Sequence, residues 1–270
     1  MPYHQLLDSL PIVGVLGAFT LFAVITSELG YRLGYWWQKR THEEKEGPTA
    51  MIVGSLLALM GFLLAISMGM ASDRFDLRRG LLLTEANSIG TTYLRAGYLP
   101  EPASSEIRNL LREYVPLRIT TNDMNAVGRK IAKSADIHTQ LWSITEALAR
   151  AAPESEVLAL FIVSLNETID LHETRIVAGI YGRVPETVIY LLLLGSFLTL
   201  GMVGYNAGLS LRRSSLSAIV LILVLCAVIT LVIDLDRSGD GFLKVNQQPL
   251  IDLQEQLGVP LPAAPSDKSG

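Results

Sequence analysis

Four long runs of apolar residues constrain this chain more than any other feature of its sequence. They cover residues 12–29, 50–71, 187–211 and 214–233, and Glu28 is the one charged residue within them. A hydrocarbon core about 30 Å thick needs roughly 20 consecutive apolar residues in a helix. In a chain of 270 residues, four such runs leave too little polar sequence to cover them in a soluble fold. The sequence therefore predicts an integral membrane protein that crosses the bilayer four times.

The polar segments between these runs predict how the four crossings are arranged. A short polar segment, residues 31–49, joins the first two runs, and a turn around Arg212 and Arg213 joins the last two. No window shows sustained strand alternation, so we expect an all-α protein. The expected parts are a first transmembrane hairpin (12–71), a helical extramembrane segment (72–186), a second transmembrane hairpin (187–233) and a polar C-terminal tail with a disordered end (234–270).

The middle segment carries most of the charged residues, and its apolar residues recur at helical spacing. Proline and glycine divide this segment into helical stretches. We expect the second apolar run to continue as a helix to about Gly97, followed by helices over about 107–115, 124–151 and 156–181.

Charge limits both the location and the partners of the chain. Residues 1–11 contain no Lys or Arg, so the first run is expected to remain as a helix rather than to be cleaved as a signal peptide. Basic residues in the short loops favour a cytoplasmic position for residues 31–49, but further basic residues lie near the opposite membrane ends, which leaves the side of residues 72–186 open. A net charge of −4 argues against nucleic acid as a partner. We expect a multi-pass protein of a bacterial plasma (inner) membrane.

Charged residues at two membrane ends are the candidate functional side chains. The second run continues without a helix breaker into Asp73, Arg74 and Arg78, and Glu85 follows. This pattern is typical either of a charged vestibule that concentrates ions or of a solvated helix end. Glu28 lies four residues before Arg32, so the two could pair at the interface, where Glu28 would serve as part of an ion path or as a simple anchor.

Two small-xxx-small spacings predict close packing of membrane helices. They are Gly30-x-x-x-Gly34 at the end of the first run and Gly204-x-x-x-Gly208 in the third. Glycine at this spacing lets helix backbones approach closely, so both motifs favour packing or assembly.

The sequence lacks the usual signatures of an enzyme or of a metal site. It contains no zinc-protease, phosphate-loop or serine-hydrolase motif, and His172-Glu173 is expected on a solvated helix face. Cys226 is the single cysteine, which excludes an intrachain disulfide. The segment from Asp234 imitates a calcium loop but has Val245 where a ligating Glu is required, so we expect a capped turn there. We expect no enzymatic activity, cofactor or metal.

The order of several short motifs resembles the bestrophin-like family, whose members are distantly similar to bestrophin ion channels. Together these motifs span most of the chain, from about residue 12 to residue 250. They are Glu28 to Gly34, Asp73-Arg74-Phe75, Glu85-Ala86, Arg175 with Pro185, and Asp234-Leu235-Asp236-Arg237.

The resemblance implies a homo-oligomeric ion channel in the lipid bilayer, built as a pentameric ring in bestrophins, that conducts small inorganic ions. It also implies that the second membrane helix lines the pore, with an apolar neck formed at Leu59, Phe62, Leu63, Ile66 and Met70. The candidates for a charged network or vestibule around such a pore are Glu28, Arg32, Asp73, Arg74, Arg78 and Glu85. Bestrophins place their helical middle segment in the cytoplasm.

Two other functions remain open from the sequence. A non-conducting scaffold or sensor whose middle segment binds a partner explains the long helices equally well. A secondary transporter is less favoured, because the four runs contain no broken helix and little polar lining at mid-membrane.

Overall fold

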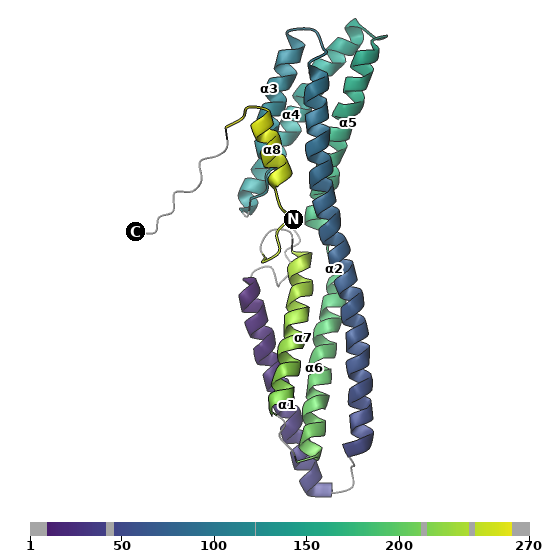
Figure 1. Ribbon diagram of the computed structural model, residues 1–270, viewed down its shortest axis with the longest axis vertical. Coiled ribbons are helices and arrows are strands. Elements are labelled where there is room, and N and C mark those ends of the chain that lie inside the picture. Colours follow the sequence, from purple (N-terminus) through teal and green to yellow (C-terminus); the bar gives the residue numbers. More distant parts are fainter. Residues whose placement is uncertain (1–9, 42–45, 122, 212–214, 238–240, 261–270) are drawn as a thin grey trace, which may run out of the picture. The chain divides into compact units, whose positions relative to one another are not determined.

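The computed structural model describes residues 10–41, 46–121, 123–211, 215–237 and 241–260 (Figure 1). Every regular element within these ranges is a helix, which confirms the all-α prediction. The α-helices are α1 (Ile12–Thr41), α2 (Glu46–Ala96), α3 (Ala103–Arg118), α4 (Met124–Ala151), α5 (Glu156–Ile176), α6 (Glu186–Leu209), α7 (Ser215–Asp236) and α8 (Gln248–Gln256). A short π-helix, Val177–Tyr181, follows α5.

Four helices in the described part of the chain are long and apolar enough to cross a membrane. The apolar runs predicted from the sequence lie in α1, α2, α6 and α7. Most side chains in these apolar stretches are not buried within the single chain, as expected for helices that face lipid or other subunits. The chain is an integral membrane protein.

The chain forms two compact units, and α2 contributes to both. Unit 1 comprises residues 1–75 and 182–244, and unit 2 comprises residues 76–181 and 245–270. The division therefore falls within α2, between Phe75 and Asp76.

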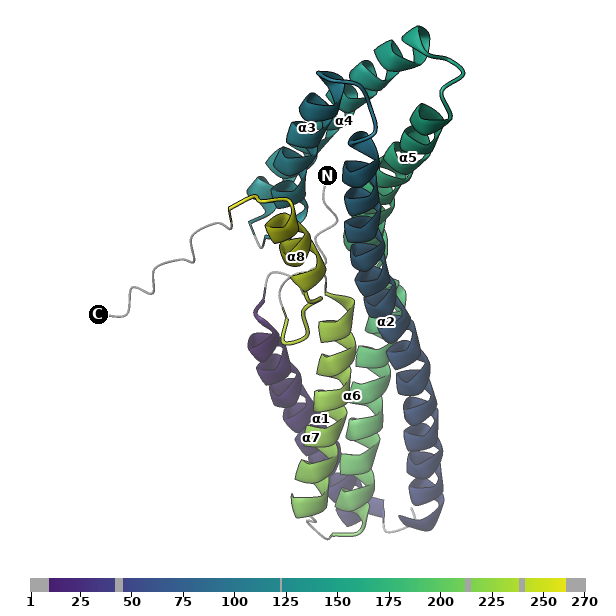
Figure 2. The same ribbon diagram turned by 45° about the horizontal axis from the view of Figure 1, so that its top comes forward.

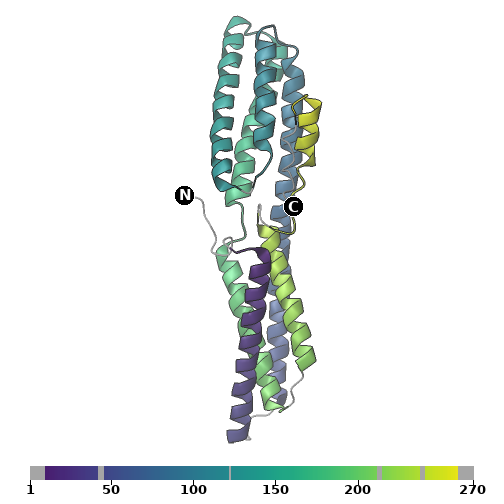
Figure 3. The same cartoon turned by 90° about the vertical axis from the view of Figure 1, so that its left-hand side faces the viewer.

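In unit 1, α1 packs along α6, and α7 packs against both (Figure 3). The two predicted small-xxx-small motifs meet at the crossing of α1 and α6. A Cβ atom added at Gly30 would overlap the carbonyl oxygen of Gly201, and one added at Gly204 would overlap the carbonyl oxygen of Ser27. The two backbones can approach this closely because at each of these points at least one helix has a glycine, which carries no side chain.

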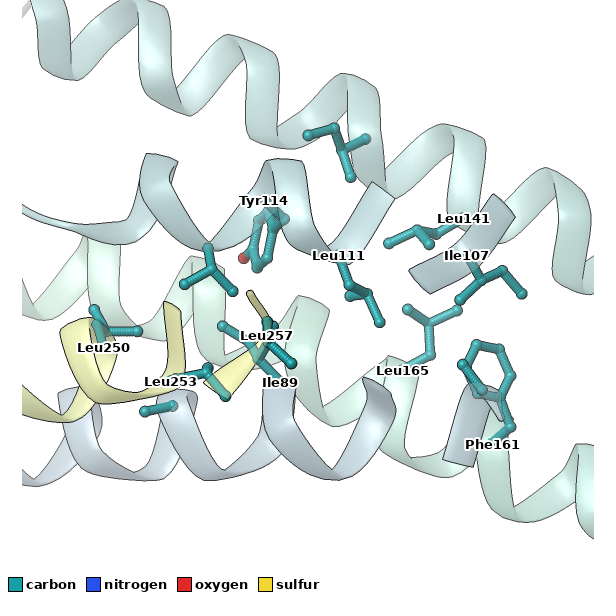
Figure 4. Packing of buried hydrophobic residues seen from close by; sticks show 14 of the residues in the cluster. Ile89, Ile107, Leu111, Tyr114, Leu141, Phe161, Leu165, Leu250, Leu253 and Leu257 are labelled. Atoms are coloured by element: carbon teal, nitrogen blue, oxygen red, sulfur yellow. The ribbon is translucent and has the colours of Figure 1, made fainter. Parts of the chain in front are cut away.

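Unit 2 is a helical bundle around one hydrophobic core (Figures 2 and 4). The core side chains come from the C-terminal part of α2 and from α3, α4, α5 and α8, and the fully buried ones include Ile89, Ile107, Leu111, Leu141, Phe161, Leu165 and Leu250. Their spacing of three, four or seven residues along each helix gives the apolar stripe that such a bundle requires. Helices α3 and α4, and α5 together with the π-helix that follows it, cover the stretches that the sequence predicted as helical.

The C-terminal segment differs from the polar tail that we expected after residue 233. Leu250, Leu253 and Leu257 recur at helical spacing, and α8 packs them into the core of unit 2. This segment therefore contributes to the fold. The end that was expected to be disordered, residues 261–270, lies outside the described residues.

Two buried aspartates at the end of α7 shape the loops of unit 1. Asp236 Oδ1 accepts a hydrogen bond of 2.7 Å from the Val184 N–H group, just before α6. The Asp234 carboxylate accepts hydrogen bonds of 3.0 Å from the N–H groups of Phe242 and Leu243. Asp234 therefore caps the following turn, as the sequence suggested.

Candidate functional site

An apolar face of α2 in unit 1 remains uncovered within the single chain. Leu59, Phe62 and Ile66 are 53%, 62% and 45% exposed, and their spacing places them on one side of the helix. Leu63 is half-buried at the edge of this face. Met70, also half-buried, packs against the small cluster around Ala71. The five residues proposed for an apolar neck thus lie along one side of α2, and three of them are exposed.

A neighbouring side of α2 attaches the helix to the rest of unit 1. Met60, Ser67 and Ala71 are buried there, at spacings of seven and four residues. A Cβ atom at Gly195 of α6 would come within 2.9 Å of the Met60 sulfur, so α2 and α6 are in side-chain contact. Because one side of α2 is anchored, the exposed side has a fixed direction within unit 1.

Charged residues follow the apolar face along α2. Asp73 is exposed, and it lies seven residues after Ile66, on the same side of the helix. Arg74 is exposed beside it. Arg78 belongs to unit 2, where it is buried. Among the predicted vestibule residues on α2, Asp73 and Arg74 are therefore the two that solvent reaches directly.

The predicted pair between Glu28 and Arg32 forms on α1. Arg32 Nε donates a hydrogen bond of 2.9 Å to Glu28 Oε1. The pair lies on the surface of unit 1, where the Arg32 side chain is 73% exposed and the Glu28 side chain is 34% exposed.

Glu85, another predicted candidate, lies in the interior of unit 2. Its side chain is fully buried, and Arg118 Nε of α3 donates a hydrogen bond of 2.7 Å to Glu85 Oε1. Arg175 Nη1 of α5 donates to the other carboxylate oxygen. Arg175 also contacts Thr120, with its Nη2 3.3 Å from the hydroxyl oxygen. One carboxylate thus connects α2, α3 and α5 in the interior of unit 2.

A buried cluster of three rings adjoins these ion pairs, and the sequence did not indicate it. The ring centroids of Tyr114 and His138 are 5.0 Å apart, and those of His138 and His172 are 4.8 Å apart. The Tyr114 hydroxyl lies 3.3 Å from His172 Nδ1. The prediction that His172 lies on a solvated face is wrong, since the side chain is 1% exposed. No group of three or more metal-ligating side chains occurs among the described residues.

Burial keeps both histidines neutral. Desolvation, together with the positive charge of Arg118, lowers the pKa of His138 to about 4 and that of His172 to about 3. His138 and Arg175 lower the pKa of His172 further. Burial also raises the pKa of the Tyr114 hydroxyl. At neutral pH the three rings are therefore uncharged, and they pack and hydrogen-bond beside the ion pairs of Glu85.

We expect this cluster to make unit 2 sensitive to acid. In the unfolded chain both histidines take up protons near pH 6.5, whereas in the folded chain they do so only near pH 4 and pH 3. The contribution of the neutral histidines to the stability of unit 2 is therefore fully present above about pH 6.5 and is lost as the pH falls towards 3, by several kcal/mol in total.

Thermal melting followed by circular dichroism at pH 7, 5 and 4 measures this loss. Replacing His172 with leucine should flatten the pH dependence, because the deeper of the two proton sites is gone, even if the variant melts lower at pH 7. The acidic residues are the same in both proteins, so the difference between the two pH dependences reports the histidine. Parallel curves for the two proteins would show that the histidines do not cause the acid sensitivity.

Comparison with known proteins identifies relatives that match most of the chain. A family model described as a bestrophin-like domain matches residues 18–250. A search of curated protein sequences found no match.

Solved structures give the same picture of the fold. A crystal structure of a bacterial bestrophin homologue from Klebsiella pneumoniae aligns with a TM-score of 0.63 at 15% identity, covering 90% of this chain and 96% of that chain. A second structure of the homologue, with a different substitution, aligns with a TM-score of 0.64 at 16% identity and covers 91% and 97%. A crystal structure described as a membrane protein aligns with a TM-score of 0.64 at 15% identity and covers 91% and 97%.

Proposed function

This chain belongs to the bestrophin-like family, and from that premise we propose that it is a homo-oligomeric ion channel whose pore is lined by α2. The observation that supports this proposal best is the uncovered apolar face of α2 in unit 1, formed around Leu59, Phe62 and Ile66. Several copies of one chain can place this face around a common axis, where it would form a narrow apolar neck. A pentameric ring, as in bestrophins, is the arrangement that we propose.

We propose that the membrane part consists of two hairpins. The first comprises α1 and the part of α2 in unit 1, and the second comprises α6 and α7. Residues 72–186 would then lie outside the bilayer. This assignment is supported by the polar surface of that segment, since charged side chains such as Arg79, Arg129 and Lys133 are costly to place in hydrocarbon.

The proposed neck suggests how ion flow could be controlled. An apolar constriction resists ions because water leaves it easily, and small changes in its width switch conduction on and off. Phe62 has the bulkiest side chain on the exposed face and would set the width. Asp73 and Arg74, at the end of this face, would concentrate ions at the entrance. Glu85, with its partners Arg118 and Arg175, is instead assigned to the stability of unit 2.

Recordings from purified protein in planar bilayers test the channel. Replacing Phe62 with alanine should widen the neck and raise the unitary conductance at least about twofold. Replacing Arg74 with alanine should shift the reversal potential in a salt gradient, because a charge at the entrance is removed. The matched control is Phe22→Ala, since Phe22 is equally exposed but lies on α1.

Size measurement of the protein in lipid nanodiscs gives an independent check. A ring around a pore requires at least three copies, and we expect five. A strict monomer or dimer, together with electrical silence over a range of ions and pH values, would exclude the pore and favour a scaffold or sensor.

A further inference from the structure

A groove in unit 1 runs along the crossing of α1 and α6, and the proposed pore does not use it. Its volume is about 670 Å³, within the range of roughly 300–1,000 Å³ typical of small-molecule sites. Gly30 and Gly201 lie where the two helices touch, and larger side chains stand on either side. Those include Leu33, Trp36 and Trp37 from α1, and Phe197, Leu198 and Tyr205 from α6.

The lining suits a hydrocarbon chain better than a water-soluble ligand. Almost all of the groove surface is apolar, and the hydroxyl of Thr26 already donates a hydrogen bond of 2.8 Å to the Phe22 carbonyl oxygen within α1. A polar ligand would leave its own groups unpaired there, which is costly in an apolar site. The groove belongs to helices of membrane-spanning length and composition, so acyl chains are the most abundant apolar molecules around it.

Two basic residues lie near the end of the groove that Trp36 and Trp37 form. Arg40 is seven residues after Leu33, which places both on the same side of α1. Its guanidinium lies over the ring of Trp36, 4.8 Å from the ring centroid. Lys39 Nζ lies 4.4 Å from the ring centroid of Tyr35 next to it. Tryptophan and tyrosine side chains favour the headgroup level of a bilayer, and lysine and arginine beside them attract anionic headgroups.

We propose that this groove binds an anionic phospholipid, with one acyl chain between α1 and α6 and the phosphate at Arg40. The apolar lining selects the acyl chain, the paired tryptophans hold its upper part at the interface, and the guanidinium selects negative charge. This site is separate from the ion path and does not depend on conduction. The positive charge of Arg40 complements an anionic headgroup, and for this reason we assign the groove to a lipid rather than to a second copy of the chain.

Native mass spectrometry of the full-length protein tests this proposal. The protein is titrated with phosphatidylglycerol or with phosphatidylcholine of identical acyl chains, and the lipids retained per chain give an apparent Kd for each. We expect phosphatidylglycerol to bind about fivefold more tightly, since one cation near the headgroup contributes about 1 kcal/mol. Arg40→Gln should abolish this preference, whereas Arg129→Gln, an exposed arginine of α4, should retain it.

Filling the groove tests the position of the acyl chain. Leu198→Trp should weaken binding of both lipids at least about tenfold, because the larger ring occupies the groove. The matched control is Leu191→Trp, on the same side of α6 but away from the groove, which should bind like the unaltered protein. If Leu198→Trp does not fold, the comparison of Arg40→Gln with Arg129→Gln still tests the proposal, because it measures the preference for the anionic lipid.

Three results would overturn the proposal. The first is equal affinity of the unaltered protein for the two lipids, and the second is unchanged lipid binding by a folded Leu198→Trp protein. The third is a loss of oligomer mass in Leu198→Trp with lipid binding retained, which would assign the groove to a second copy of the chain. None of these results decides whether the unaltered protein conducts ions, so the lipid site and the channel are tested separately.

Discussion

Replacing Glu85 with glutamine is expected to lower the free energy of unfolding of unit 2 by about 3–5 kcal/mol. The side chain is fully buried, and both carboxylate oxygens accept hydrogen bonds from arginines, Arg118 and Arg175. Glutamine has nearly the same shape, so the packing changes little, but it carries no charge. Two guanidinium groups would then remain in the bundle without a counter-charge, and this accounts for the large effect.

Hydrogen exchange of the backbone amides in α3 and α5 measures this change directly, and thermal melting provides a second readout. The matched control is Glu113→Gln, because Glu113 is mostly exposed and lies 3.7 Å from Lys133. An exposed pair of this kind contributes at most about 1 kcal/mol, so the control should melt close to the unaltered protein. If the two variants melt together, the two ion pairs of Glu85 contribute little to the stability of unit 2.

The membrane-spanning helices could be predicted from the sequence because the bilayer requires an uninterrupted run of apolar residues. Every residue of a span must tolerate hydrocarbon, so the signal is a long run that is visible without knowing any contact. Helix α8 carries a much weaker signal. Three leucines in a short polar segment become informative only when the surface that receives them, the core of unit 2, is known.

In the candidate site, too, contacts between residues close in the sequence could be predicted, whereas contacts between distant residues could not. The pair Glu28–Arg32 lies within one helix turn, so its spacing alone predicted the contact that the structure contains. Glu85 meets Arg118 and Arg175 across three helices, 33 and 90 positions away, and no spacing rule reaches that far. The ring cluster of Tyr114, His138 and His172 was missed for the same reason.

Replacing Gly30 with alanine should destabilise unit 1 by about 3 kcal/mol or more, although the change adds a single methyl group. The new Cβ atom would overlap the carbonyl oxygen of Gly201, and a backbone atom cannot move aside as a side chain can. The helices α1 and α6 would have to separate along the crossing, which loses contacts over several turns. Gly204→Ala should have a similar effect, because its Cβ atom would overlap the carbonyl oxygen of Ser27.

The control for this prediction is Gly17→Ala on the same helix, where nothing lies within 4 Å of the added Cβ atom. Alanine favours the helix by up to about 1 kcal/mol over glycine, so Gly17→Ala should be neutral or slightly stabilising. The fraction of protein that remains monodisperse after heating in detergent separates the two variants. Equal melting of Gly30→Ala and Gly17→Ala would mean that α1 and α6 are not in backbone contact. The predicted opposite signs arise because the same methyl group meets open space at one glycine and a peptide carbonyl at the other.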